Sequence, residues 1–306
     1  MPSVFARRLE RAEEHATERF RPWNFGIPQL DGVVKGVRPG FTNLIVARPH
    51  VGKTLLVLAG IRNNPDVPTL FVSADDDPDV VVRKMMQFDG IIEDGWQASR
   101  SMMSEYIERF YPNLDVIDDV TWGPSAHNGK VTLADGIDRF QDAYQVPPGL
   151  VVYDYLGIDG NDFAQAVMTA SWMKSMTKVL PMPVLTIAQS SRQGAKTVVE
   201  DGQKVRRGFR MEDLSYGGEQ QAGLMMGLSS ATAYVGGMTR PVIEVDVVKN
   251  KAVFDGSGIT NSLTPIVLCH SSGRLTDRMT VEREFMAGMD NQRREAQEYA
   301  RSSYFD

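Results

Sequence analysis

The stretch NLIVARPHVGKTLLVL, residues 43–58, joins an apolar strand to an apolar helix through a short polar loop. Its centre, Ala47 to Thr54, fits the phosphate-binding pattern GxxxxGK[ST], with alanine in place of the first glycine. In such a loop, backbone N–H groups and the positive end of the helix dipole surround the phosphates. The pattern therefore predicts a nucleotide site made by Arg48, Pro49, His50, Val51, Gly52, Lys53 and Thr54.

Within this loop, each residue type suits one task. Gly52 lets the backbone approach the phosphates, Lys53 reaches the terminal phosphates, and Thr54 can ligate Mg²⁺. A second carboxylate normally holds Mg²⁺ from the end of a buried strand. The run LVVYD, residues 150–154, supplies Asp154 directly after apolar residues, where a helix cap or turn fits poorly. We expect ATP and Mg²⁺ as cofactors, with Thr54 and Asp154 at the metal.

Short apolar runs rich in valine, isoleucine and leucine follow the loop at intervals and predict buried strands. They are Asn43–Ala47, Thr69–Ala74, Leu150–Asp154, Val184–Ala188 and Val242–Val248. The predicted helices between them are Lys53–Arg62, Asp79–Phe88 and Met168–Val179. Strands that lack strict alternation are typical of a sheet covered on both faces, and their alternation with helices favours an α/β fold with a mainly parallel central sheet flanked by helices.

Composition limits the function classes. The chain has 306 residues, a formal net charge of −6 and 42% hydrophobic residues, which excludes a histone-like protein that coats DNA everywhere. A single cysteine excludes an internal disulfide, and Cys269 with His270 is at best half a zinc site, so a buried cysteine is favoured. No apolar run approaches the ~20 residues that span a bilayer, so we expect a cytoplasmic protein without membrane contact.

The flanking segments differ from this pattern. Residues 1–22 predict an amphipathic helix that rests on another surface or is solvated, residues 23–280 form the main domain, and residues 281–306 form a charged helix and tail. The polar segment Gly194–Arg210 predicts a loop. Around it, Arg192 to Arg210 contains six basic and two acidic residues, a local basic patch of the kind that nucleic-acid binding needs.

Several motifs, taken in order, resemble the ATPase domain of DnaB-type replicative helicases, within the RecA-like group, over Phe25 to Gly273. They are FGIPQLD at 25–31 with RPG at 38–40, ARP at 47–49, DYL at 154–156, PVLTIAQSSR at 183–192, and MEDL at 211–214 with EQQA at 219–222. The resemblance implies a RecA-like P-loop NTPase in which Gln189 senses the γ-phosphate. It also implies that the linker-type helix docks on an adjacent subunit.

The departures from that family concern the catalytic and DNA-facing residues. Asp75 stands where the family has its catalytic glutamate, and Lys251 stands where the family has an arginine finger. Lys249 and Lys251 instead resemble the paired lysines with which RecA recombinases reach a neighbour's ATP. The DNA-facing segment has no arginine at its usual place, and its implied contacts are Arg206, Arg207, Arg210, Ser215, Tyr216, Gly217 and Gly218.

The resemblance thus implies an ATP-dependent helicase or translocase that acts on single-stranded DNA in replication as a homo-oligomer, a hexameric ring. Bare ATPase domains of this kind are common in phages, which implies a separate loader or primase partner and the cytoplasm of a bacterial host. Two alternatives stay open. The first is a filament-forming RecA-like recombinase or recombination mediator, favoured by the lysine pair. The second is a regulatory P-loop protein with weak hydrolysis, favoured by Asp75 and Lys251.

Overall fold

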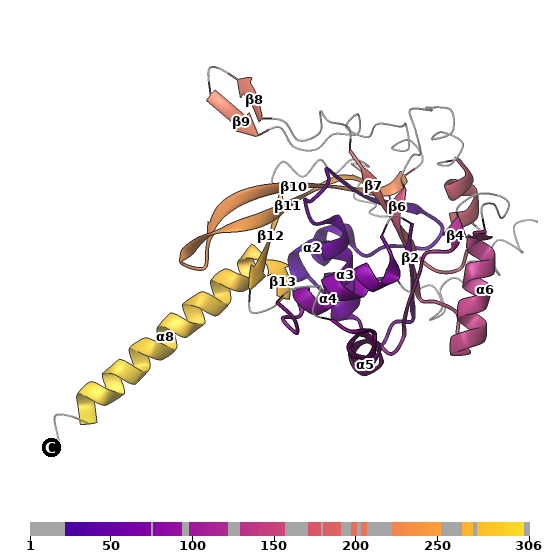
Figure 1. Cartoon of the computed structure of the whole chain (residues 1–306). Helices are drawn as coiled ribbons and strands as arrows, with labels where there is room; N and C mark the ends of the chain where they lie inside the picture. The colour runs from indigo at the N-terminus through magenta and orange to yellow at the C-terminus, as the bar shows by residue number, and fades with distance from the viewer. Residues whose placement is uncertain are drawn as a thin grey trace, which may run out of the picture.

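The computed structural model describes residues 22–74, 76–93, 98–121, 129–156, 171–178, 180–190, 197–200, 203–206, 222–251, 265–271 and 274–302. Across these residues, one nine-stranded sheet runs in the order β13-β12-β11-β10-β1-β7-β6-β2-β3 (Figure 1). Of the amphipathic helix predicted over residues 1–22, residues 1–21 lie outside the described residues.

Six neighbouring strands are parallel and form the centre and one side of the sheet. They are β10 (Ala222–Val235), β1 (Thr42–Ala47), β7 (Val184–Gln189), β6 (Leu150–Leu156), β2 (Thr69–Ser73) and β3 (Leu114–Ile117). Every residue of β1 and β2 is buried, as expected for strands with helices on both faces. The predicted mixed α/β architecture is confirmed, and each of the five predicted strands is present with its ends moved by a few residues.

Alternating side chains of these strands divide the core into two layers. Ile45 and Phe71 point to a layer with α2 (Pro28–Val34), α3 (Lys53–Asn63), α4 (Pro78–Phe88) and α5 (Arg100–Phe110). Leu44 and Leu70 point to a second layer with α6 (Leu133–Tyr144) and Met173, which lies in helical residues 171–177. Of the predicted helix Met168–Val179, only part lies within the described residues.

The other side of the sheet is antiparallel. β10 pairs with β11 (Met238–Asn250), which continues to β12 (Ile266–Ser271) and β13 (Arg274–Asp277). Gly236 and Gly237 join β10 to β11 with positive φ angles of 59° and 78°, the conformation that a two-residue hairpin turn needs. Sequence reasoning predicted only the last part of this hairpin, because β10 combines methionine, glycine and small residues that carry little strand propensity.

Outside the main sheet, β8 (Thr197–Glu200) and β9 (Gln203–Arg206) form a hairpin within the segment predicted to be a loop. That prediction was wrong for these residues. The sequence held the signal, since Asp-Gly at positions 201–202 separates two valine-containing runs by two residues. A further small sheet pairs β4 (Val120–Thr121) with β5 (Val131–Thr132).

The C-terminal helix α8 (Arg278–Ser302) projects from the sheet edge (Figure 1). It begins three residues before the expected boundary at residue 281, because Asp277 accepts a hydrogen bond from the Thr280 N–H at 2.9 Å and so caps the first turn. Val281, in its first turn, is buried, whereas residues 283–295 of the helix are exposed. Among the described helices, none has the length and apolar character needed to cross a membrane.

Candidate functional site

The glycine-containing loop lies where β1 passes into α3, at the carboxyl edge of the parallel strands. Arg48, Pro49 and His50 are exposed and Val51 is partly exposed, so the loop faces solvent directly after a fully buried strand. Helix α3 is anchored behind it, since six consecutive residues from Leu56 to Ile61 are buried. Ligands of open α/β sheets bind at this edge, which makes the loop the centre of the candidate site.

Gly52 has a backbone conformation that residues with a side chain rarely adopt. It is the N-cap residue of α3 with φ +105°, and a Cβ placed on it would lie 2.8 Å from Cδ1 of Ile243 on β11. Glycine is thus required here both by the backbone and by the close approach of a neighbouring strand. The loop also contains His50 at φ 62°, so two of its residues have positive φ angles.

Lys53 folds back over the loop that precedes it. Its ammonium group donates hydrogen bonds to the carbonyl oxygens of Arg48 at 3.0 Å and of Ala47 at 3.4 Å. The positive charge therefore lies over the loop, at the N-terminal end of α3, where the helix dipole also attracts anions. The sequence predicted that this ammonium group reaches the terminal phosphates of a bound nucleotide, and that stays a prediction.

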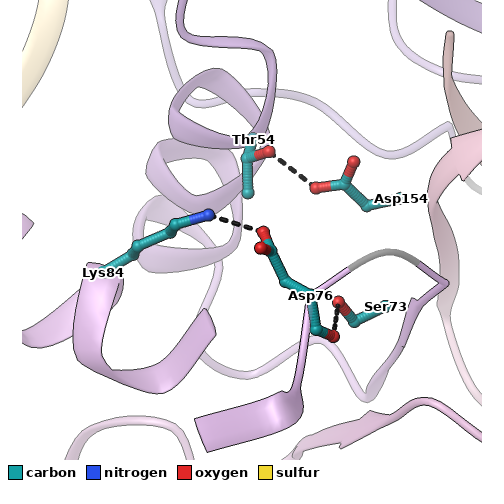
Figure 2. A network of polar contacts seen from close by, with 5 residues as sticks. All are labelled: Thr54, Ser73, Asp76, Lys84 and Asp154. Atoms are coloured by element: carbon teal, nitrogen blue, oxygen red, sulfur yellow. Dashed lines mark hydrogen bonds and ion pairs between the residues drawn. The ribbon is translucent and has the colours of Figure 1, made fainter. Parts of the chain in front are cut away.

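Thr54 and Asp154 meet although they are a hundred residues apart in the chain. The Thr54 hydroxyl donates a hydrogen bond of 2.6 Å to Oδ2 of Asp154, which lies on β6 and is only 8% exposed (Figure 2). Burial raises the pKa of the Asp154 carboxyl above its ordinary value of 3.8, the hydrogen bond from Thr54 opposes that effect, and the negative charge of Asp76 adds to it.

A hydroxyl and a carboxylate oxygen fit the donor set of Mg²⁺, which takes few protein ligands and completes its shell with water and phosphate oxygens. Among the described residues, no group of three or more His, Cys, Asp or Glu side chains is arranged to hold a metal without such help. Cys269 is buried in the sheet, as its sequence context favoured. Of the described side chains, Thr54 and Asp154 thus remain the candidates for a metal.

Asp76 is an acidic residue near Thr54 and Asp154 that the sequence did not single out. Its carboxylate forms an ion pair with Lys84 of α4 at 2.5 Å, and its carbonyl oxygen accepts a 2.6 Å hydrogen bond from the Ser73 hydroxyl (Figure 2). The predicted Asp75 lies outside the described residues. Three consecutive aspartates occupy positions 75–77, and Asp77 is used as the N-cap of α4, where it accepts a hydrogen bond from the Asp79 N–H.

Gln189 joins the site as predicted. It ends β7, the strand beside β1, and its register partner is Ala47 at the start of the loop. The next residue strengthens this junction, because the Ser190 N–H donates a hydrogen bond of 3.1 Å to the Ala47 carbonyl oxygen. Gln189 is partly exposed at the carboxyl edge.

Lys249 and Lys251 do not join this cluster. Lys249 lies within β11, which ends at Asn250, so the prediction that it follows the strand was wrong by two residues. Because β11 runs antiparallel to β10, Asn250 pairs with Leu224 near the start of the parallel strands, whereas Ala47 pairs with Leu228 at the other end. Both lysines thus lie at the amino-terminal ends of the parallel strands, whereas the loop of their own chain lies at the carboxyl ends.

The expected DNA-facing residues are largely outside the described residues. Arg206 is the last residue of β9. Arg207, Arg210, Ser215, Tyr216, Gly217 and Gly218 lie outside the described ranges.

Comparisons with known proteins agree with this geometry. The family model for the DnaB-like helicase C terminal domain matches residues 24–251. Among solved structures, the ATPase domain of G40P is 20% identical, with a TM-score of 0.60 over 90% of this chain and 99% of that chain. A DnaB-like replicative helicase, described with its interactions with primase, is 19% identical, with a TM-score of 0.59 over 90% of this chain and 68% of that chain.

A more distant similarity extends to the KaiC-like protein PH0186 from Pyrococcus horikoshii OT3, which is 13% identical with a TM-score of 0.51 over 84% of this chain and 99% of that chain. At these identities the structural matches show the fold alone. No curated protein matches the chain by sequence.

Proposed function

The chain belongs to the family of DnaB-like helicase C-terminal domains and is a P-loop NTPase, and on that premise we propose that it is an ATP-driven helicase or translocase acting on single-stranded DNA in replication. The observation that carries the proposal is the 2.6 Å contact between Thr54 and Asp154 beside Lys53, because it joins the two halves of a nucleotide and metal site. The proposed cofactors are ATP and Mg²⁺.

In this site Lys53 would leave its loop carbonyls to bind the terminal phosphates of the nucleotide, and Thr54 and Asp154 would hold Mg²⁺. When bound, Mg²⁺ neutralises charge on the phosphate oxygens. Gln189, beside the start of the loop, is suited to sense whether the terminal phosphate is present. Lys53→Ala is expected to abolish hydrolysis, and unchanged turnover in that variant would refute the site.

For the residue that acts on the attacking water, we propose Asp75, which stands where the resembled family has its catalytic glutamate. The alternative is the neighbouring Asp76, whose charge acts on Asp154 and whose backbone is fixed by Ser73, at the end of β2. General-base catalysis contributes about 10²–10⁴-fold to a rate. Asp75→Asn should therefore lower kcat about a hundredfold or more, whereas Asp76→Asn should have a smaller effect. The reverse order would assign the role to Asp76.

Lys249 and Lys251 are proposed to complete hydrolysis on a neighbouring subunit. Their position at the opposite sheet edge supports this, since they cannot reach the loop of their own chain. Subunits carrying Lys251→Ala, mixed with subunits carrying Lys53→Ala, should regain some active sites because the two defects lie on opposite sides of one interface. Absence of recovery at every mixing ratio would argue against a shared site.

Single-stranded DNA is proposed to bind the basic segment from Arg206 to Gly218. Replacing Arg206, Arg207 and Arg210 with alanine should lower the slope of log affinity against log salt by about 2, taking ~0.7 per phosphate contact for single strands. Tyr216→Ala should weaken binding with little change in slope, because stacking on a base does not release counterions. An unchanged slope in the triple variant would exclude this segment as the DNA site.

The proposed assembly is a hexameric ring in which residues 1–22 form a helix that docks on the adjacent subunit, with a loader or primase as a separate partner in a bacterial cytoplasm. Deleting residues 1–21 should shift sedimentation from ring to monomer. The second candidate is a RecA-like filament, which is favoured by the lysine pair in the sequence VKNK, residues 248–251. Electron microscopy with ATP and single-stranded DNA distinguishes closed rings from such filaments.

The function as a whole is tested by steady-state ATP hydrolysis with and without single-stranded DNA. We expect ATP turnover that single-stranded DNA stimulates. We also expect activity in strand-separation or translocation assays. Binding of ATP without hydrolysis would instead support the regulatory alternative.

A further inference from the structure

Helix α8 carries exposed apolar side chains beyond the point where it leaves the sheet. Its first turns pack on the β10–β11 hairpin, with Val281 in one buried cluster with Val235 and with Phe285 against Gly237. Residues 283–295 are exposed, and α8 lies outside the residues that the family model matches (Figure 1). A helical segment of about a dozen residues is marginal in water without a packed face, so we expect this one to have a partner.

The exposed methionines of α8 follow a heptad spacing. Met279, Met286 and Met289 are 58%, 58% and 38% exposed, and Glu282 and Arg293 complete the alternating steps of three and four residues. These five positions fit the a and d positions of a coiled coil and lie in one stripe along the helix, here called the α8 stripe. Methionine suits such a stripe because its flexible side chain adapts to the surface that it meets.

The two charged residues of the α8 stripe decide between the possible orientations of a helix pair. In a parallel pair in register, Glu282 lies against Glu282 of the second copy and Arg293 against Arg293, so like charges meet. In an antiparallel pair, a two-fold axis midway between Met286 and Met289 places these two methionines against each other. The same axis places Glu282 against Arg293 of the second copy, because both pairs have the same midpoint in the sequence.

Glu282 has room for this second partner. Its Oε1 accepts a 2.6 Å hydrogen bond from Nε of Arg278 one turn earlier, and the Glu282 side chain is still 45% exposed. An ionised carboxylate accepts several hydrogen bonds, so the contact with Arg278 leaves acceptor sites on Glu282. Exposed ion pairs add little affinity, so the methionines supply the buried apolar surface and the charges select the orientation.

We propose that α8 is a self-association surface through which two copies of this chain pair as an antiparallel coiled coil. Met286 lies against Met289 of the second copy, and Glu282 lies against Arg293. A two-fold pair uses the same surface on both copies, so the self-complementary order of charges in the α8 stripe identifies a second copy as the occupant. The α8 stripe lies outside the nucleotide site, and the inference does not depend on the proposed helicase function.

Disulfide cross-linking of the full chain reports this contact directly, whatever larger assembly the subunits form. Chains with Met286→Cys are mixed with chains that carry Met289→Cys and a tag, so that a gel without reductant separates mixed from like-with-like products after a short, quenched oxidation. The control is Asn291→Cys, which places the thiol on the opposite face of α8. The native Cys269 is 1% exposed, so the wild type should not cross-link.

We expect the mixed product to exceed both like-with-like products, and Asn291→Cys to give little product. Added to both chains, Glu282→Arg should raise the protein concentration for half-maximal cross-linking about tenfold, because two arginines then meet at each end of the pair. Glu282→Arg/Arg293→Glu should return that concentration close to its original value, since opposite charges meet again. Glu284→Arg makes the same charge change on the opposite face and should leave it unchanged.

Four results would overturn the inference. A product mainly between two Met286→Cys chains would indicate a parallel pair, and equal cross-linking at Asn291→Cys would indicate random collision. No recovery in the charge-swapped variant would show that Glu282 and Arg293 do not meet. Absence of any cross-link on α8 would refute self-association and assign the α8 stripe to another occupant, either residues 1–21 or a different protein.

Discussion

The contact between Gly52 and Ile243 allows a quantitative test of how β11 supports the nucleotide loop. In Gly52→Ala, the new methyl group meets two obstacles at once. The backbone must keep φ +105°, which L side chains rarely adopt, and the Cβ lies 2.8 Å from Cδ1 of Ile243. The next nearest atoms, Cγ1 of Ile243 at 3.7 Å and Cβ of Leu55 at 3.8 Å, are at ordinary contact distance. The steric part of the defect therefore depends on one methyl group.

That dependence sets the magnitudes. Strain at a disfavoured φ costs on the order of 1–3 kcal/mol, and overpacking costs about the same. We expect Gly52→Ala to lower the free energy of unfolding by about 3 kcal/mol. Ile243→Val alone removes Cδ1 and should cost about 0.5–1.5 kcal/mol. In the double variant Gly52→Ala/Ile243→Val, the clash with Cδ1 is absent. The loss of unfolding free energy in the double variant should therefore be smaller than the sum of the two single losses by about 1–2 kcal/mol.

Denaturant unfolding of the nucleotide-free protein, followed by circular dichroism, measures all four corners of this cycle. Ile137→Val serves as the control partner, because Ile137 is a buried residue of α6 on the other face of the sheet. Gly52→Ala with Ile137→Val should be additive within about 0.5 kcal/mol. If Gly52→Ala and Ile243→Val are equally additive, the loop is able to move away from β11, and the close approach of Ile243 does not restrict the residue at position 52.

Three further predictions concern buried polar groups. Burial raises the pKa of the Asp154 carboxyl, so this carboxyl loses its proton at a lower pH in the unfolded chain than in the folded protein. The free energy of unfolding of the metal-free wild type, relative to that of Asp154→Asn, should therefore fall as pH rises from about 3.8 and level off above the raised pKa. A difference that does not depend on pH would contradict this. Asn250→Ala should cost about 1–3 kcal/mol in chemical denaturation, since Asn250 is 2% exposed and its amide donates a 2.8 Å hydrogen bond to the Val34 carbonyl oxygen. Tyr106→Phe should lower the melting temperature through loss of about 1.5–3 kcal/mol, because its hydroxyl donates a 2.8 Å bond to Asp89, and a wild-type melting curve would show that the bond contributes nothing.

The parts of the fold that sequence predicted well are those fixed by local chemistry. A continuous apolar run such as LIVA, residues 44–47, has no solvent-facing side and must be a buried strand, and Gly-Lys-Thr after it fixes the start of a helix. The fold class and the five strands followed from such runs, and the P-loop pattern placed Thr54 and Asp154 at one predicted metal site, where the structure has them 2.6 Å apart. The ends of the strands were less certain, because backbone pairing with a neighbour and not side-chain polarity decides them. Lys249 shows this, since it is polar and still lies within β11.

The resemblance to a family singled out Asp75 among the consecutive aspartates Asp75, Asp76 and Asp77, a choice that the residues alone do not make. All three follow the same strand and carry the same group, so spacing alone does not separate them. Their roles depend on tertiary partners: Asp77 caps α4, and Asp76 is oriented by Ser73 and Lys84. Lys84 had no motif to mark it, since it is a helical lysine eight residues beyond its partner and becomes notable only through that contact.

One continuous strand connects the two ends of the proposed catalytic machinery. Ile243 touches Gly52 at the carboxyl edge of the sheet, and Lys249 lies six residues later on β11, a span of about 20 Å at ~3.4 Å per residue. Between these two residues β11 stays paired with β10, with one register shift at Met225 and Met226. If Lys249 reaches the nucleotide of the next subunit as proposed, this one strand contributes to two neighbouring pockets, with Ile243 against the loop of its own chain and Lys249 at the nucleotide of the neighbour.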